Sequence, residues 1–238
     1  MINQFFKLTQ TIAYFLKLII QSLLGETTAK RRLTEMYLDV LYEKSKLPQV
    51  TPPTPNGPIL LAPQRVSDLY VHLPQRFTLL TERELYALIS LFKESNPSEV
   101  LEIGCFKGGS SYHFLLNSSS STQIYSVDKT FKNVPSPIMQ ALQESKRFHK
   151  LETSSDKLDV SPYKKKFDFI FIDGSHEYAD VKSDTLKSLE MLKAGGVIVW
   201  DDYSPGFPGV YRWLNEFKDQ GHNVLNIQGT SLAFYRSI

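Results

Sequence analysis

Two apolar runs separated by a segment of helical length dominate the C-terminal half of the sequence. Phe167–Ile172 is apolar at almost every position and rich in aromatic residues, which is typical of a strand buried on both faces. A helix is predicted over residues 178–192, where the apolar positions are Tyr178, Val181, Leu186, Leu189 and Leu192. Gly195 and Gly196 are expected to break this helix before a second apolar strand at residues 197–200. The order predicts a βαβ unit, in which the two strands lie parallel in one sheet.

Acidic residues follow both of these strands directly. Asp173 comes after the first strand, with His176 in the same turn, and Asp201 and Asp202 come after the second. Parallel strands end at the same edge of a sheet, and open α/β sheets bind their ligands at that carboxyl edge. The sequence therefore predicts that three carboxylates and one imidazole converge in a single site.

The pattern before and after this unit predicts more alternating helices and strands. Thr81-Glu82-Arg83-Glu84 forms a capping box that opens a helix through Phe92. Strands are expected at residues 100–103, 124–127 and 148–152, helices after the turn at 104–111 and at 137–146 and 210–218, and a closing hairpin at 223–227 and 231–235. This alternation favours the α/β class, with a parallel sheet.

The first 78 residues differ in pattern from the rest of the chain. Residues 1–45 are predicted to be helical, with a strongly apolar stretch at 5–24, and residues 46–77 form an extended connector dense in proline. Lys17 and the flanking polar groups argue against a membrane span. Three interpretations stay open for residues 5–24: a helix packed on the body or on a sister subunit, a helix on a membrane surface, or a substrate lid. Burial against protein is favoured, which predicts a homo-oligomer. The expected domains are residues 1–78, the extension, and residues 79–238, the catalytic body.

Composition narrows the choice of function and compartment. The chain has 238 residues, 42% of them hydrophobic, and a formal net charge of +2. A charge so close to neutral gives no support for nucleic-acid binding. The single cysteine, Cys105, excludes a disulfide framework within one chain and a multi-cysteine zinc site. We therefore expect a cytoplasmic protein, with a peripheral membrane contact through residues 5–24 as the alternative.

The glycine-rich turn after the strand at 100–103 indicates the ligand class. A dinucleotide fingerprint would need glycine where the chain has Phe106, and a phosphate-binding loop would need lysine where it has Ser110. The remaining pattern is an acidic residue, Glu102, followed by Gly104 and Gly108, where glycines let the backbone pass close under a ligand. The acidic residue suits a ligand with a positive end. Asp128, at the end of the next strand, suits a ribose diol.

With these motifs, residues 81–238 resemble the class I S-adenosylmethionine (SAM)-dependent methyltransferases. The resemblance implies a Rossmann-like, seven-stranded, mostly parallel sheet with an antiparallel strand near the C-terminus. Asp173-Gly174-Ser175-His176 followed by Gly195-Gly196 and Asp201-Asp202-Tyr203 is similar to metal-dependent small-molecule O-methyltransferases of the macrocin and mycinamicin type.

The resemblance also implies roles for individual residues. The implied cofactor-binding residues are Glu102, Gly104, Cys105, Gly108, Asp128, Ser154, Ser155 and Asp173, with Asp156 as a further candidate near the adenine. The implied metal ligands are Asp173, Asp201 and Asp202. The implied catalytic residues are His176, as the base, and Asp173. One departure concerns the adenine contacts, because Thr153 stands where relatives often carry glycine.

The predicted function is Mg²⁺-assisted O-methylation of a hydroxyl on a small molecule, such as a sugar, a polyketide or another natural product, with SAM as the methyl donor. A hard cation held by carboxylates can bind the hydroxyl and lower its pKa. Two alternatives stay open at this point. One is a metal-independent methyltransferase that uses His176 alone, and the other is a SAM-binding partner protein without catalysis.

Overall fold

The computed structural model describes residues 78–238, so the predictions for residues 1–77 lie outside the described residues. The helices are α3 (Glu82–Ser95), α4 (Gly109–Asn117), α5 (Ser136–Glu144), α6 (Tyr178–Met191) and α7 (Pro208–Asp219), with short 3₁₀ turns η2 (Ser155–Lys157) and η3 (Ser161–Tyr163). The strands are β1 (Glu99–Ile103), β2 (Gln123–Asp128), β3 (Phe148–Glu152), β4 (Phe167–Ile172), β5 (Leu192–Trp200), β6 (Leu225–Asn226) and β7 (Ala233–Arg236). None of these helices is long and apolar enough to cross a membrane.

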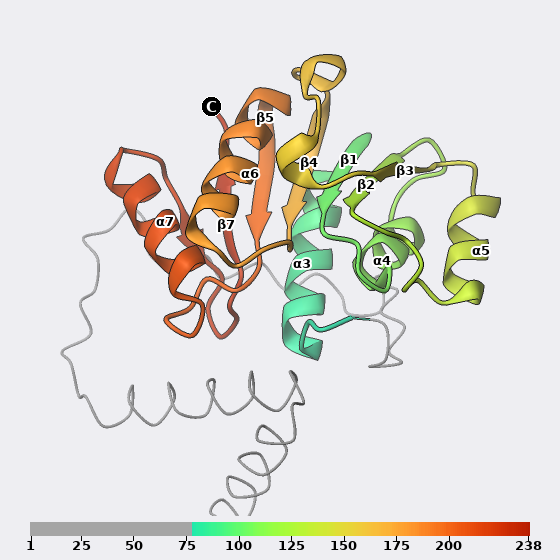
Figure 1. The fold of residues 1–238 in the computed structure, drawn as a ribbon, viewed down its shortest axis with the longest axis horizontal. Coiled ribbons are helices and arrows are strands. Elements are labelled where there is room, and N and C mark those ends of the chain that lie inside the picture. Colours follow the sequence, from blue (N-terminus) through green and yellow to red (C-terminus); the bar gives the residue numbers. More distant parts are fainter. Residues whose placement is uncertain (1–77) are drawn as a thin grey trace, which may run out of the picture. The chain divides into compact units, whose positions relative to one another are not determined.

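Within residues 78–238 the strands form one seven-stranded sheet in the order β3-β2-β1-β4-β5-β7-β6 (Figure 1). Strands β1 to β5 pair in parallel, and β7 runs antiparallel to both of its neighbours. The chain moves outward from β1 to β3 and then returns to place β4 on the other side of β1. Ligands bind at such a reversal point, at the carboxyl ends of the strands. The predicted mostly parallel sheet with an antiparallel C-terminal strand is confirmed.

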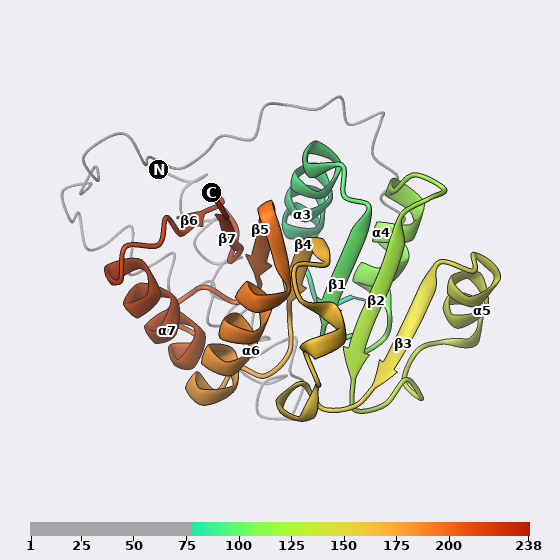
Figure 2. The same ribbon diagram turned by 90° about the horizontal axis from the view of Figure 1, so that it is seen from above.

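Helices cover the two faces of the sheet in separate layers (Figure 2). On one face, Phe169 and Phe171 of β4 pack with Phe92 of α3 and Phe114 of α4. On the other face, Ile170 lies in the cluster that contains the buried residues of α6 and α7. Because consecutive strand residues point to opposite faces, an almost uninterrupted apolar run is what a strand between two helical layers requires. The prediction that β4 is buried on both faces is therefore confirmed.

The start of α3 is fixed to the far end of the chain by one buried carboxylate. Thr81 and Glu84 form the predicted capping box, with Glu84 Oε2 accepting from the Thr81 backbone N–H at 2.8 Å. The other oxygen, Oε1, accepts from the Ser231 backbone N–H at 3.1 Å and from its hydroxyl at 2.5 Å. Glu84 thus holds the segment before β7, which lies beside the carboxyl end of β5.

Strand β5 begins earlier than the sequence predicted. Leu192 already pairs with Phe167, and the register then shifts so that Phe169 pairs with Val197. The prediction that Gly195 and Gly196 separate a helix from a strand was wrong, because they lie inside the strand, in the irregular part of the ladder. Gly195 has a φ of +75°, and this left-handed conformation lets the bulged strand return to its partner.

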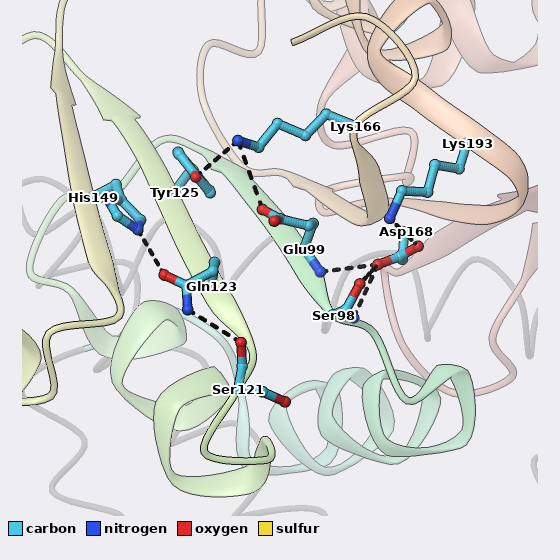
Figure 3. Close-up of polar contacts among 9 residues, drawn as sticks. All are labelled: Ser98, Glu99, Ser121, Gln123, Tyr125, His149, Lys166, Asp168 and Lys193. Atoms are coloured by element: carbon cyan, nitrogen blue, oxygen red, sulfur yellow. Dashed lines mark hydrogen bonds and ion pairs between the residues drawn. The ribbon is translucent and has the colours of Figure 1, made fainter.

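Polar contacts stabilise the edge of the sheet at which the parallel strands begin, opposite the predicted site (Figure 3). Asp168 Oδ2 accepts from the Ser98 hydroxyl at 2.6 Å and from the backbone N–H groups of Ser98 and Glu99, both at 2.9 Å. Partial burial acts to raise the pKa of Asp168, but these donors and the Lys193 ammonium at 2.9 Å leave it below its usual value. The network joins β1 to β4 and so fixes the register of the two strands whose carboxyl ends carry Glu102 and Asp173.

Helix α6 turns a partly polar face toward the sheet. The apolar pattern included Leu186, but this side chain is 46% exposed. The buried residues of the helix are Val181, Asp184, Thr185, Ser188 and Met191. The helix was predicted correctly, but three of its buried positions were missed because they are polar.

Thr185 accounts for one of these polar positions and allows a direct stability test. Its Oγ1 accepts from the indole N–H groups of Trp200 and Trp213, both at 3.0 Å, and donates to the Val181 carbonyl. The nearly isosteric change Thr185→Val leaves the two buried indole N–H groups without a hydrogen-bond acceptor. We therefore expect the free energy of unfolding to fall by about 2–4 kcal/mol in urea titrations. Thr185→Ser keeps the hydroxyl and should lose about 1 kcal/mol. Equal losses in both variants would contradict the hydrogen-bond account.

Candidate functional site

Three side chains meet at the carboxyl edge of the sheet, where β4 and β5 end. Asp173, His176 and Asp202 each offer a ligand atom, and these atoms all lie within 4.8 Å of one another. His176 Nε2 is 2.8 Å from Asp202 Oδ2. The imidazole is 49% exposed, whereas the Asp202 carboxylate is almost fully buried. The cluster is therefore buried at Asp202 and accessible to solvent at His176. A substrate can therefore approach the imidazole from solvent.

The backbone after β5 separates the roles of two adjacent carboxylates. Asp202 adopts a left-handed conformation with a φ of 62°, which is uncommon outside glycine but which aspartate adopts more often than most residues. Its N–H donates to Asp201 Oδ1 at 2.8 Å, and the Ser231 hydroxyl contacts the same oxygen at 3.2 Å. The structure brings the ligand atoms of Asp202, Asp173 and His176 together, while Asp201 lines the same hollow and its Oδ1 contacts Ser231.

The cluster lies beside a small hollow that is lined by both polar and apolar residues. The apolar side is formed by Val181, Trp200 and Val210. The ring of Phe207, before α7, lies with its centroid 4.7 Å from that of His176. An aromatic ring beside the imidazole limits the ways in which an acceptor can approach it, and it favours an acceptor with an apolar face.

The glycine turn packs directly against the turn that carries Asp173. Gly104 has a φ of +97°, and a Cβ atom there would lie 2.0 Å from the Asp173 carbonyl oxygen. Gly108 has a φ of +75° and precedes the first turn of α4. The chain therefore needs glycine at position 104 for two reasons, its backbone conformation and the close approach of the neighbouring turn. The two halves of the predicted site are in contact.

Asp128 holds the glycine turn from the end of β2. Its Oδ2 accepts from the backbone N–H groups of Cys105 at 2.9 Å and Phe106 at 2.8 Å, and its Oδ1 accepts from Thr130 N–H at 3.1 Å. Phe106 has a positive φ of 48° and is 43% exposed, so it stands at the open side of the turn. Asp128 is half-buried, and its carboxylate lies where strand β2 meets the turn.

Glu102 lies beneath the glycine turn, not on its surface. The side chain is fully buried and accepts hydrogen bonds from the hydroxyls of Ser110, Ser111 and Ser126. Burial raises the pKa of this carboxyl above its usual value, although the three hydroxyls act in the opposite direction. Glu102 thus ties β1 to the first turn of α4 and to β2.

Cys105 is buried against the residues that follow β2. It packs with Phe131, Val134 and Ile138. Burial and the nearby Glu102 carboxyl raise the pKa of the Cys105 thiol, so the reactive thiolate form is disfavoured. The side chain is a packing group, and its backbone N–H is the part directed at Asp128.

The turn after β3 is held by α6. Lys187 Nζ donates to the carbonyl oxygens of Ser155 at 2.6 Å and Asp156 at 2.7 Å. Ser154 and Ser155 are half-buried, and Asp156 is exposed. Sequence reasoning missed Asp184, a buried carboxylate on the same helix. Its position three residues after Val181 places it on the buried face of α6, and this spacing was the available signal.

Comparison with known proteins finds a family similar to the central part of the chain. Residues 101–203 match the family model of a methyltransferase domain. This stretch of the chain is similar to a methyltransferase domain. A search of curated protein sequences gives no match to the chain.

Solved structures support this methyltransferase domain through its fold. An O-methyltransferase from Bacillus cereus in complex with SAH has a TM-score of 0.53 at 16% identity, over 66% of this chain and 82% of that protein. TomG from Streptomyces achromogenes, an O-methyltransferase involved in tomaymycin synthesis and in complex with SAM, has a TM-score of 0.53 at 17% identity, over 70% and 84%. The SAH-bound methyltransferase PaMTH1 from Podospora anserina has a TM-score of 0.51 at 16% sequence identity, over 70% of this chain and 83% of that protein.

The class I methyltransferase fold expected from the sequence is therefore confirmed, and residues 101–203 are similar to a methyltransferase domain. The methyltransferase domain carries its acidic cluster and its glycine turn on the same edge of the sheet.

Proposed function

We propose that this methyltransferase transfers the methyl group of SAM to a hydroxyl of a small molecule at the cluster of Asp173, His176 and Asp202. One observation carries the proposal: this cluster adjoins the glycine turn, with Gly104 packed against the Asp173 carbonyl. A donor bound over the turn and an acceptor bound over the cluster would be neighbours. Holding two reactants in this way supplies much of the rate gain in a transfer reaction.

In this proposal His176 is the general base for the acceptor hydroxyl. Asp202 Oδ2 lies 2.8 Å from Nε2 and favours a proton on that nitrogen, so Nδ1 is the nitrogen that can accept a proton. A hydroxyl is a poor nucleophile until it loses its proton, and an imidazole in reach can remove it. Asp202 orients the ring and stabilises the imidazolium that forms.

The donor set also fits a divalent cation. Asp173 and Asp202 would supply carboxylate oxygens, and we propose Mg²⁺ as the cation because it prefers oxygen ligands. A cation there would lower the pKa of a bound hydroxyl. Asp201 was part of the metal set implied by the sequence; it lines the same hollow, but the group of ligand atoms within 4.8 Å of one another consists of Asp173, His176 and Asp202, so we propose a set without it.

A second candidate is the metal-independent reaction with His176 as the only activating group. The contact between His176 Nε2 and Asp202 Oδ2 favours this metal-independent reaction, because Asp202 Oδ2 then accepts a hydrogen bond from the imidazole and does not bind a cation. The two candidates differ in what Asp202 binds during turnover.

The test combines cofactor binding with turnover. Calorimetry on the full chain should show SAH binding, and incubation of labelled SAM with hydroxylated acceptors such as sugars or polyketides should give a labelled ether. With Mg²⁺ in the reaction, chelation and Asp202→Asn should each lower kcat at least tenfold, whereas Asp201→Asn should have a smaller effect. Turnover that survives chelation but falls in Asp202→Asn would favour the second candidate. Absence of SAH binding by the wild type would overturn both.

The remaining expectations about partners concern residues outside the described part of the chain. We propose a homo-oligomer in the cytoplasm, in which residues 5–24 contact protein or a membrane surface. The proposal is supported by the apolar pattern of that segment alone.

A further inference from the structure

Asp184 of helix α6 is a buried carboxylate that the proposed reaction does not use. It is 1% exposed, and neither of its oxygens accepts a hydrogen bond of good geometry in the described part of the chain. Burial raises the pKa of this carboxyl to about 6. Burying a carboxylate without hydrogen-bond donors costs free energy, and a hydrogen bond from a nearby donor to its oxygens stabilises it.

The position of Asp184 connects it to two turns of the cofactor edge. Its Oδ2 lies 3.8 Å from the place where a Cβ atom of Gly174 would be, next to Asp173. The Ser155 side chain is also close enough to lower the pKa of the carboxyl. The next turn-facing residue of the helix, Lys187, already binds the Ser155 and Asp156 carbonyls. One face of α6 therefore contacts both the turn after β3 and the turn after β4.

We propose that Asp184 is a positioning residue for SAM: its carboxylate takes the Ser155 hydroxyl when the cofactor binds and so fixes the Ser155–Lys157 turn against Gly174. The inference rests on the assignment of the SAM site to this edge of the sheet. Asp184 is too deeply buried to touch the cofactor, and it acts through Ser155. The Lys187 contacts anchor the backbone of the turn, and Asp184 sets the orientation of its side chain.

This arrangement makes the cofactor affinity depend on the charge of Asp184. The charged groups around it are Asp180 and Lys187 on its own helix and Asp156 on the facing turn, while Gly174 brings no charge. The Ser155 side chain already acts to lower the pKa of Asp184, and a closer contact in the complex favours the carboxylate more, so this pKa falls further when the cofactor binds. Affinity is therefore highest above the free-state pKa of about 6 and declines as the pH falls through it.

The experiment measures SAH affinity of the full-length protein by calorimetry between pH 5 and pH 8. We expect the wild type to bind about tenfold more weakly at pH 5 than at pH 7.5. Asp184→Asn should bind weakly at both pH values, with a flat profile. Glu190→Gln removes an exposed carboxylate of α6 that is not among the charged groups acting on Asp184, and it should keep the wild-type profile.

A double-mutant cycle separates positioning from mere stabilisation of the fold. If Asp184 acts through Ser155, then Ser155→Ala and Asp184→Asn each weaken SAH binding, and the double variant is no weaker than either. Additive losses, or a sloping pH profile that persists in Asp184→Asn, would overturn the inference. These outcomes are distinct from failure of the proposed function, in which the wild type would not bind SAH at any pH.

Discussion

His176→Ala is expected to lower kcat by about 10²–10⁴-fold while SAH binds as in the wild type. The imidazole is the half-exposed member of the cluster, and the almost fully buried Asp202 lies 2.8 Å from its Nε2. Removing it deletes the proposed base but leaves the glycine turn and the β3 turn intact. Single-turnover rates with SAM and a responsive acceptor, measured beside SAH calorimetry, separate the two effects.

The matched control for this prediction is His149→Ala. His149 lies on β3, where it stacks on Tyr125 and contacts Gln123 toward the amino edge of the sheet (Figure 3). We expect its kcat to stay within about threefold of the wild type, since it lies outside the reacting cluster. A His176→Ala enzyme that also turns over within threefold would show that the proton leaves by another route.

Strand positions were the part of the fold that the sequence defined best. Phe167–Ile172 and Phe148–Glu152 were predicted with the bounds that the structure shows. Both are short, end at polar turns and contain residues that suit a pleated surface. Because the strands are parallel, their order along the chain was enough to place Asp173 and Asp202 at one edge.

The site could not be predicted at the level of single carboxylates. Asp201 and Asp202 are neighbours in sequence, and in the structure it is Asp202, with a left-handed backbone, that contacts His176. Backbone conformation at one residue depends on tertiary contacts, here the Ser231 segment that holds Asp201. No propensity rule carries that information, because an aspartate in a loop accepts either conformation.

Glu102 shows a different limit of sequence reasoning. Its charge suggested attraction to a positively charged ligand, whereas the structure places it under Ser110, Ser111 and Ser126 with no exposed surface. Three hydroxyls that converge on one carboxylate come from β2 and α4, and the sequence alone does not show that they meet. Asp184 was missed because the buried face of α6 was predicted from its apolar positions alone.

Gly104→Ala is expected to destabilise the domain by about 3–5 kcal/mol and to abolish measurable SAH binding. The new Cβ atom would lie 2.0 Å from the Asp173 carbonyl oxygen and 2.6 Å from its carbonyl carbon. These are backbone atoms at the end of β4, so a side-chain rotation cannot relieve the clash. Either the glycine turn or the Asp173 turn must move, and the donor and acceptor halves of the site then separate.

Gly195→Ala is the control that isolates the clash from the backbone strain. Gly195 has a φ of +75°, close to the +97° of Gly104, but a Cβ atom there meets nothing within 4 Å. It should lose only the left-handed penalty, about 1–2 kcal/mol, and bind SAH as the wild type does. Urea unfolding gives the two free energies, and calorimetry gives the two affinities. If Gly104→Ala lost no more stability than Gly195→Ala and still bound SAH, the contact between the two turns would not be what joins the halves of the site.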